Sequence, residues 1–151
     1  MAQRQPEKHG EYDHKLLEVR RTARVVAGGR RFSFRVAVIV GNHRQRVGLG
    51  IGKGPDVQTA VAQAIERGTK SVITVPLRKE TITYAASAKY AAAKIMIRPA
   101  SVGKGVIAGG AMRSVLSLAG IPNITGKVLS RTTNKINVAR ATLKALTQLT
   151  S

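Results

Sequence analysis

Apolar and polar side chains alternate regularly through the middle of the N-terminal half. Between residues 31 and 40 the odd positions begin with Arg31, Ser33 and Arg35, while every even position is apolar. Successive side chains of a strand point to opposite faces of a sheet, so the pattern predicts a strand with one basic and one apolar face. We expect the apolar face to lie in the core; its residues are Phe32, Phe34, Val36, Val38 and Val40.

A second alternating run follows a short basic turn, Gly41-Asn42-His43-Arg44. Large apolar side chains here alternate with three glycines, which are Gly48, Gly50 and Gly52. A row of glycines weakens a strand unless another group approaches its backbone closely. The pattern therefore predicts a second strand whose glycine face packs tightly against a neighbour.

The segments before these strands add two elements. A short helix is expected over Lys15–Val19, and a strand over Arg20–Ala27. The pair Gly28-Gly29 supplies the positive φ that a tight connection between strands needs.

A helix follows the glycine-bearing strand. Pro55 suits the first helical position and Asp56 suits the positive end of the helix dipole. One apolar stripe at helical spacing is formed by Val57, Ala60, Val61, Ala64 and Ile65. The N-terminal unit is thus predicted as (α)βββα, a small α+β fold.

The C-terminal half predicts a second α+β unit, with a boundary near residues 76–86. Two short extended runs are expected around Pro76, and the alanine-rich segment after them favours neither helix nor strand. Strands are expected over Lys94–Pro99 and around Lys127–Ser130, with a loop-like segment at 101–110 between them. Two helices are expected, one carrying Met112, Val115, Leu116 and Ala119, and the last carrying Val138, Ala141, Thr142, Ala145, Leu146 and Leu149.

Basic residues are spread over both halves. The 151 residues include 26 Lys and Arg but only 7 Asp and Glu, which gives a formal net charge of +19. All seven acids lie at or before Glu80, and none lies among the nine Lys and Arg between Arg20 and Lys53. A surface kept basic only for solubility would normally mix both signs. An anionic partner relieves such self-repulsion, so the charge indicates a nucleic-acid backbone.

Composition also excludes several classes. With no cysteine the chain has no disulfide or thiolate metal site, and it lacks an apolar run of the length that a membrane span needs. The N-terminal MAQRQPEKHGEYDHK is too polar for a secretory signal. We expect a cytoplasmic protein, with a disordered lead over residues 1–12, a first domain over 13–76 and a second over 84–151.

The sequence does not support an enzyme. GLGIGKG at Gly48–Gly54 has three residues instead of four before its Gly-Lys pair, and Gly54 stands where a phosphate loop has Ser or Thr. We expect its glycines to allow close packing, against RNA or the second domain. The three histidines lack metal-ligand spacing, and no acid after Glu80 completes a Ser/His/Asp set. No cofactor, metal or small-molecule substrate is predicted.

The start of the first C-terminal helix is a candidate anion site. Gly109 and Gly110 precede a helix whose free N–H groups attract anions. Arg113 lies in its first turn, where the helix dipole disfavours a cation. Two interpretations stay open: an anionic partner binds here, or Arg113 is simply exposed at a small cost.

Among nucleic-acid binders the options narrow to folded RNA. Phe32 and Phe34 share the phase of the core residues, so the stacking platform of an RRM is missing. No zinc finger is possible without cysteine, and no predicted helix is basic enough to be a recognition helix. What remains is recognition of a structured backbone by Arg and Lys on a sheet edge and loops.

Four stretches, GGRRFSFRVAVIVG, RVGLGIGKG, PASVGKGVIAGGAMRSVLSLAGI and NKINVARATLKAL, resemble the bacterial small-subunit ribosomal protein S-five family. The resemblance runs from about Glu11 to Leu149. It implies an N-terminal domain like a double-stranded-RNA-binding domain and a C-terminal domain with a left-handed βαβ crossover. It also implies a structural protein that binds small-subunit ribosomal RNA and supports assembly, translational accuracy and the mRNA entry channel. The alternatives are a free-standing RNA-binding or RNA-remodelling factor and, from another class, a small-molecule kinase or nucleotide hydrolase built on the second domain.

The resemblance also implies where the partners bind. The hairpin would contact RNA near the decoding region and the spectinomycin site, through Arg20, Arg21, Thr22, Arg24, Gly28, Gly29, Arg30 and Arg31. Further basic positions expected at RNA are Arg35, Arg44, Arg46, Lys53, Lys104, Arg131 and Lys135. The second domain would face protein S-four near mRNA, through Gly103, Gly109, Gly110 and Arg113, with protein S-eight as a further neighbour.

The chain departs from the family pattern at several positions. The turn before RVG is Asn42–Gln45 and contains no glycine, and the usual His- and Gly-containing segment is replaced by Tyr84–Ala92. The Asn-Pro pair before the last helix is Asn134-Lys135. The chain ends soon after that helix, which weakens the expected contact with S-eight.

Overall fold

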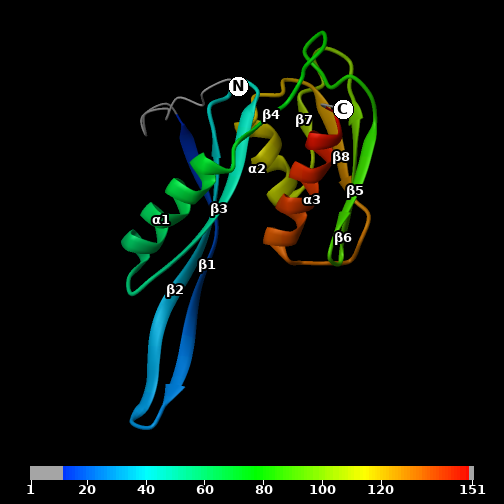
Figure 1. Ribbon diagram of the computed structural model, residues 1–151. Helices are drawn as coiled ribbons and strands as arrows, with labels where there is room; N and C mark the ends of the chain where they lie inside the picture. The colour runs from blue at the N-terminus through cyan, green and yellow to red at the C-terminus, as the bar shows by residue number, and fades with distance from the viewer. Residues whose placement is uncertain (1–11, 150–151) are drawn as a thin grey trace.

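The computed structural model describes residues 12–149, which form four layers. Helix α1 covers one face of a first sheet, and helices α2 and α3 lie between that sheet and a second sheet (Figure 1). The chain is an α+β protein, as expected. The expected disordered lead lies outside the described residues, apart from Tyr12, whose hydroxyl accepts a hydrogen bond from Arg46 (3.3 Å).

The first sheet has the antiparallel order β1-β2-β3-β4. Its strands are β1 (Asp13–Val26), β2 (Gly29–Gly41), β3 (Arg46–Gly54) and β4 (Ile73–Thr74). Val36, Val38 and Val40 are fully buried against α1 (Val57–Lys70), as the alternation predicts. Ile39, on the opposite face, is buried in the larger core that contains α2 and α3. Both faces of this end of β2 are therefore covered.

The glycines of β3 pack against the backbone of α1. A Cβ atom on Gly48, Gly50 or Gly52 would overlap carbonyl oxygens of α1, and for Gly50 and Gly52 these are the oxygens of Ala64 and Ala60. The expectation that these glycines allow close packing is confirmed, but the expected packing partner, RNA or the second domain, was wrong. The neighbour is the helix of the same domain, because only a strand without side chains lets that helix lie directly on it.

Helix α1 begins two residues later than expected. Asp56 is the N-cap, and its carboxylate accepts a hydrogen bond from the backbone N–H of Thr59 (3.2 Å). Hydrogen bonding to the Thr59 side chain, together with this backbone bond, lowers the pKa of Asp56 below its ordinary value. Pro55 therefore precedes the cap and does not occupy the first helical position.

The helix expected over Lys15–Val19 was wrong. These residues belong to β1, which pairs with β2 from Asp13 opposite Gly41 and has a bulge between Leu16 and Glu18. The bulge changes which face of the sheet Leu16 and Leu17 point to. Leu17 packs against the core around α2 and α3. Long-range pairing with β2 overrides the weak local preference of five residues for a helix.

The second sheet has the order β5-β6-β8-β7, in which β7 and β8 are parallel and the other pairs antiparallel. Its strands are β5 (Ala86–Tyr90), β6 (Ala93–Pro99), β7 (Val106–Ile107) and β8 (Ile124–Val128). The alanine-rich segment thus contributes a strand, and the last strand ends two residues earlier than expected. Of the runs around Pro76, only β4 is a strand of the sheet, while Arg78 and Thr81 form an isolated bridge.

Helices α2 (Gly110–Leu118) and α3 (Lys135–Gln148) pack on one face of the second sheet. The apolar stripe predicted for α3 is buried. Helix α2 connects the parallel strands β7 and β8, so the βαβ unit is present. The left-handed sense of its crossover stays a prediction.

The two domains meet where the β2–β3 turn lies on the C-terminal end of α2. The backbone N–H groups of His43 and Gln45 donate to the carbonyls of Leu118 (3.0 Å) and Ala119 (2.9 Å). Both turn residues have positive φ, 55° and 71°, so the turn adopts a conformation that usually favours glycine. These hydrogen bonds to the free carbonyls of α2 compensate for that strain.

Candidate nucleic-acid interface

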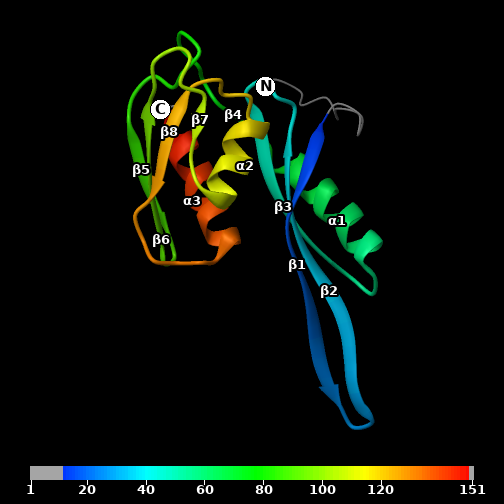
Figure 2. The ribbon, with the colours of Figure 1, turned by 180° about the vertical axis from the view of Figure 1, so that it is seen from behind.

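The hairpin formed by β1 and β2 extends well beyond the rest of the molecule (Figures 1 and 2). Strand β3 pairs with β2 only from Phe34 onward, so residues 29–33 of β2 pair with β1 alone. Phe32 lies in this extension and is 49% exposed. The prediction that Phe32 lies in the core was therefore wrong, because the alternating pattern continues along β2 beyond the part of the strand that α1 covers. Phe34 does pack against the apolar cluster beneath α1.

One face of the extension carries arginines directly opposite one another. The register pairs Arg20 with Arg35 and Arg24 with Arg31, and Thr22 with Ser33 lies between these pairs. The Thr22 and Ser33 hydroxyls are hydrogen-bonded to each other (2.8 Å). Like charges directly opposite each other on a sheet are destabilising, so the free protein bears a cost at this face.

Lys53 widens this basic face across a third strand. It pairs with Arg35 in the β2–β3 ladder, which gives the row Arg20, Arg35 and Lys53. Glu18 forms an ion pair with Arg20 (2.6 Å) at the base of the hairpin. We call the three residues of this row, the Arg24–Arg31 pair and Thr22 the basic face; its five cations are Arg20, Arg24, Arg31, Arg35 and Lys53.

The opposite face of the hairpin is exposed and carries apolar side chains together with two arginines. The Arg21 guanidinium lies 4.2 Å from the centre of the Phe32 ring, and Val25 near the tip is 80% exposed. Arg30, opposite Val25, also lies on this face and not among the paired arginines. At the tip Gly29 has φ of 132°, which fits the role expected for the glycine pair.

The tip encloses a shallow, open depression. Three of its six lining residues are arginines, which suits an anionic chain. The residues that line it are Arg24, Val26, Ala27, Gly28, Arg30 and Arg31.

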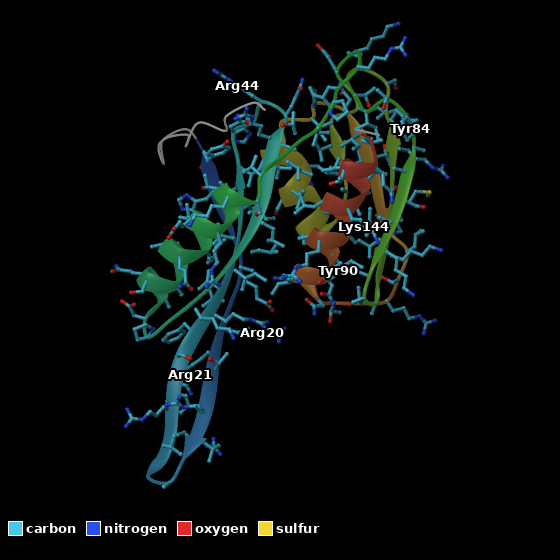
Figure 3. All side chains as sticks on the ribbon, in the orientation of Figure 1. Arg20, Arg21, Arg44, Tyr84, Tyr90 and Lys144 are labelled. Atoms are coloured by element: carbon cyan, nitrogen blue, oxygen red, sulfur yellow. The ribbon has the colours of Figure 1, made fainter. Side chains whose placement is uncertain are left out.

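The other residues expected at RNA lie in two places. The segment 129–134 and the start of α3, with Arg131 and Lys135, lie at the end of the C-terminal domain nearest the hairpin (Figure 1). Arg44 lies at the opposite end of the molecule (Figure 3), as does the β6–β7 loop that contains Lys104. Arg46 is half-buried and bonded to Tyr12. The structure therefore does not bring all the predicted residues onto one surface.

The residues expected to face S-four flank the short edge strand β7. Gly103 precedes β7, while Gly109 and Gly110 follow it and start α2; all three, with Arg113, are exposed. A Cβ atom on any of these glycines would meet no atom within 4 Å. No packing inside the described chain therefore requires glycine there, although positive φ does at Gly103 and Gly110.

Asn123 shapes this region and was overlooked as a structural residue. Its side chain is 4% exposed, and its oxygen accepts hydrogen bonds from the backbone N–H groups of Gly103 (3.2 Å) and Gly105 (3.0 Å). Its amide donates to the Glu80 carbonyl (3.4 Å). The local sequence carries no signal of this role, because the three partners lie 18 to 43 residues away.

The histidines and acids of residues 12–149 form no constellation of three or more groups that would hold a metal ion. His43 instead joins the domains: Nδ1–H donates to the Ser117 carbonyl (3.1 Å), and Nε2 lies 3.3 Å from the Asp13 carboxylate. Over the same residues, every helix is too short or too polar to cross a bilayer.

Comparison with known proteins places both domains in one family. The profile described as "Ribosomal protein S5, N-terminal domain" matches residues 12–76, and that described as "Ribosomal protein S5, C-terminal domain" matches residues 88–151.

Curated relatives agree over nearly the whole chain. The small ribosomal subunit protein uS5 of Acaryochloris marina is 46% identical over 147 residues, 97% of this chain and 82% of the relative. The uS5 proteins of Synechococcus elongatus (95% of this chain, 79% of the relative) and Thermotoga neapolitana (92% and 78%) are each 45% identical. The resemblance noted in the sequence is confirmed. The chain therefore belongs to the ribosomal protein S5 family, whose members are RNA-binding structural proteins of the small ribosomal subunit and not enzymes.

Proposed function

We propose that this chain holds small-subunit ribosomal RNA through the basic face of its β1–β2 hairpin, and that it thereby supports subunit assembly in the cytoplasm. The observation that carries the proposal is the direct pairing of Arg20 with Arg35 and of Arg24 with Arg31. A fold that only needed a stable hairpin would not place cations opposite each other on an exposed face. An RNA backbone, with one negative charge per nucleotide, converts this repulsion into attraction.

The extended shape of the hairpin supports the same function. Residues 20–33 present the basic face on one side and the Arg21–Phe32 stack on the other, away from the covering helices. Such a two-sided projection fits between RNA helices, where phosphates lie on both sides. The position of the segment 129–134 near its base adds Arg131 and Lys135 to the RNA side of the proposal.

The β7 edge is proposed as the side facing protein S-four, close to mRNA. Gly103, Gly109 and Gly110 leave open space where side chains would stand, so a partner backbone has room to approach them. Asn123 holds the loop of Gly103 in one conformation. A fixed, glycine-bearing edge is suited to a protein contact that influences decoding accuracy. Protein S-eight is a further proposed neighbour.

A paired variant tests the hairpin. Replacing Arg24 and Arg31 with Gln removes the charges of one cross-strand arginine pair and keeps a long, polar side chain at each position. We expect the variant to sediment with small subunits at low salt but to dissociate at lower salt than the unchanged chain, because fewer counterions are released on binding. The measurement is co-sedimentation of the tagged chain in cell extracts over a salt series.

The control removes the same charge elsewhere. Arg67 and Lys70 lie in the last turn of α1, where Arg67 donates to the Ile51 carbonyl and Lys70 pairs with Glu66. Gln at both positions is expected to leave the dissociation curve unchanged. If both variants behave like the unchanged chain, the hairpin is not the principal RNA contact; if the unchanged chain never sediments with small subunits, the ribosomal assignment itself fails.

A further inference from the structure

The second sheet has an uncovered face, and this face is basic. Its inner face packs on α2 and α3, whereas the outer face is exposed at Ser87 and Lys89 of β5, at Lys94 and Arg98 of β6 and at Lys127 of β8. In the views of Figures 1 and 2 no other element lies over this side of the sheet. The first sheet, in contrast, is covered on both faces behind its hairpin.

The register gathers the four cations into one patch. Lys89 lies directly opposite Lys94 in the β5–β6 ladder, and Met96, two residues along β6, lies between Ser87 and Lys127. Arg98 follows next on the same face, so the patch extends about 13 Å along β6 at about 3.3 Å per residue. We call Lys89, Lys94, Arg98 and Lys127 the sheet patch.

No described carboxylate neutralises the sheet patch. The ion pairs among residues 12–149 involve Glu18, Asp13 and Glu66, all of which belong to the first domain. No acid occurs in the sequence after Glu80. The Lys89–Lys94 pair therefore repeats, in the second domain, the unfavourable like-charge arrangement of the hairpin.

We propose that the sheet patch is a second RNA-binding surface, which takes the sugar-phosphate backbone of a folded RNA independently of the hairpin. Lysines are depleted in protein interfaces, which have an apolar and aromatic core; here three of the four cations are lysines and the face has no aromatic side chain between them. A flat surface of flexible ammonium groups suits phosphates, which it contacts without reading bases.

The anchoring of β5 supports a binding surface that keeps its shape. The Lys144 ammonium donates to the Lys89 carbonyl (3.1 Å) and Arg140 donates to the Tyr90 hydroxyl (2.6 Å), so α3 holds the outer strand from behind. Tyr84 likewise donates to the Gln148 carbonyl (2.8 Å). Figure 3 shows Tyr84, Tyr90 and Lys144 beside α3 and the second sheet. The Lys89 side chain remains available for a partner while its backbone is fixed.

The proposal rests on the ribosomal RNA function, so its test separates the two. Because the sequence has no cysteine, single cysteines at Ser87, Val25 and Gln58 each give a unique site for a tethered iron-EDTA probe. Ser87 lies on the patch, Val25 near the hairpin tip, and Gln58 on the exposed side of α1. Each labelled chain is incorporated into small subunits, and hydroxyl-radical cleavage of the ribosomal RNA is mapped.

We expect the probe at Ser87 to cleave ribosomal RNA at sites different from those reached from Val25. Cleavage from Val25 without cleavage from Ser87 would overturn the sheet patch and leave the hairpin function standing. No cleavage from either position would overturn the proposed RNA function as a whole. The probe at Gln58 measures the background cleavage from a surface that is not proposed to bind RNA.

A salt series gives a second readout. Gln at all four patch positions is expected to reduce the slope of log affinity against log salt for small-subunit ribosomal RNA by about 3, since each phosphate contact contributes roughly 0.7–0.9. The matched control places Gln at Lys15, Arg67, Arg78 and Lys79, four exposed or partly exposed cations outside the patch. An equal change in both variants would show a general charge effect and would count against the patch.

Discussion

Single positions on β3 determine how closely the first helix approaches its sheet. Gly48, Gly50 and Gly52 lie under successive turns of α1, and the nearest helix atoms are backbone carbonyls that have no freedom to move aside. Apolar area alone therefore does not explain this interface. The helix itself presents small residues, Ala60, Ala64 and Gly68, so two nearly smooth surfaces come into contact.

Gly50→Ala tests this contact at residue scale. We expect the change to lower the free energy of unfolding by roughly 1–3 kcal/mol, because the added Cβ overlaps the Ala64 carbonyl and forces backbone shifts. Urea unfolding monitored by circular dichroism measures the effect. Gly28→Ala is the control: its Cβ would meet nothing within 4 Å, so the change is expected to stay within about 0.5 kcal/mol. Equal effects at both positions would contradict the packing argument.

At the scale of elements, the hairpin bears a cost in stability that its proposed binding of RNA would offset. Its two strands hold together by backbone pairing and by the Thr22–Ser33 contact, while the flanking arginine pairs repel. In the second domain, by contrast, the side-chain contacts are stabilising: hydrogen bonds of Arg140, Lys144 and Tyr84 join α3 to β5 and to the residues just before it. Tyr84, Lys89 and Tyr90, which take part in these ties, all belong to the tyrosine-bearing segment before β6.

Arg31→Thr tests that cost and its proposed offset. Removing one member of the Arg24–Arg31 pair and placing a β-branched residue in the strand is expected to stabilise the free protein by a few tenths of a kcal/mol, up to about 1, at low salt. The same change is expected to weaken binding to ribosomal RNA. Thermal unfolding at low salt and at 1 M salt measures the first effect, whose charge component shrinks as salt screens the repulsion. A variant that is less stable and binds equally well would contradict the role of the pair.

At the scale of the whole molecule, the two domains share an apolar core between the first sheet and the helices α2 and α3, and polar contacts join them at one end. The β2–β3 turn donates to the last carbonyls of α2, and the His43 ring lies between the Ser117 carbonyl and the Asp13 carboxylate. Gly41 and Gly120 permit this approach, because a Cβ atom on either would overlap backbone across the joint. The joint sets the hairpin and the second sheet at a defined separation, as the proposed binding of folded RNA at two places requires.

The joint is expected to weaken in acid. The hydrogen bond between the Asp13 carboxylate and the His43 side chain, with a further one from the His14 backbone N–H, lowers the pKa of Asp13 below its ordinary 3.8. A lowered carboxyl pKa in the folded state contributes stability that is fully present above the ordinary pKa and is lost as pH falls through the folded pKa. Asp13→Asn should therefore reduce the loss of stability as the pH falls through 3.8 and below, measured by urea unfolding at each pH. An unchanged pH profile would show that the Asp13–His43 contact does not form in solution.

The local pattern determined much of this protein on its own. Alternation over residues 31–40 identified β2 and its basic face, and the 3.6-residue stripe identified α3, because these signals depend only on the geometry of a strand and a helix. The charge distribution indicated an anionic partner, and short glycine-rich motifs sufficed to show the family.

Tertiary structure decided what lies opposite each face. Lys15–Val19 became strand because β2 offered a pairing edge, and Phe32 became exposed because α1 ends before it. The glycines of β3 face α1, and Lys53 joins the arginines only through the β2–β3 register. The sheet patch is assembled from three strands up to 38 residues apart in sequence. The periodicity of a sequence shows which residues share one face of a strand or helix. Only the packing of distant segments determines whether that face contacts a helix, another domain or solvent.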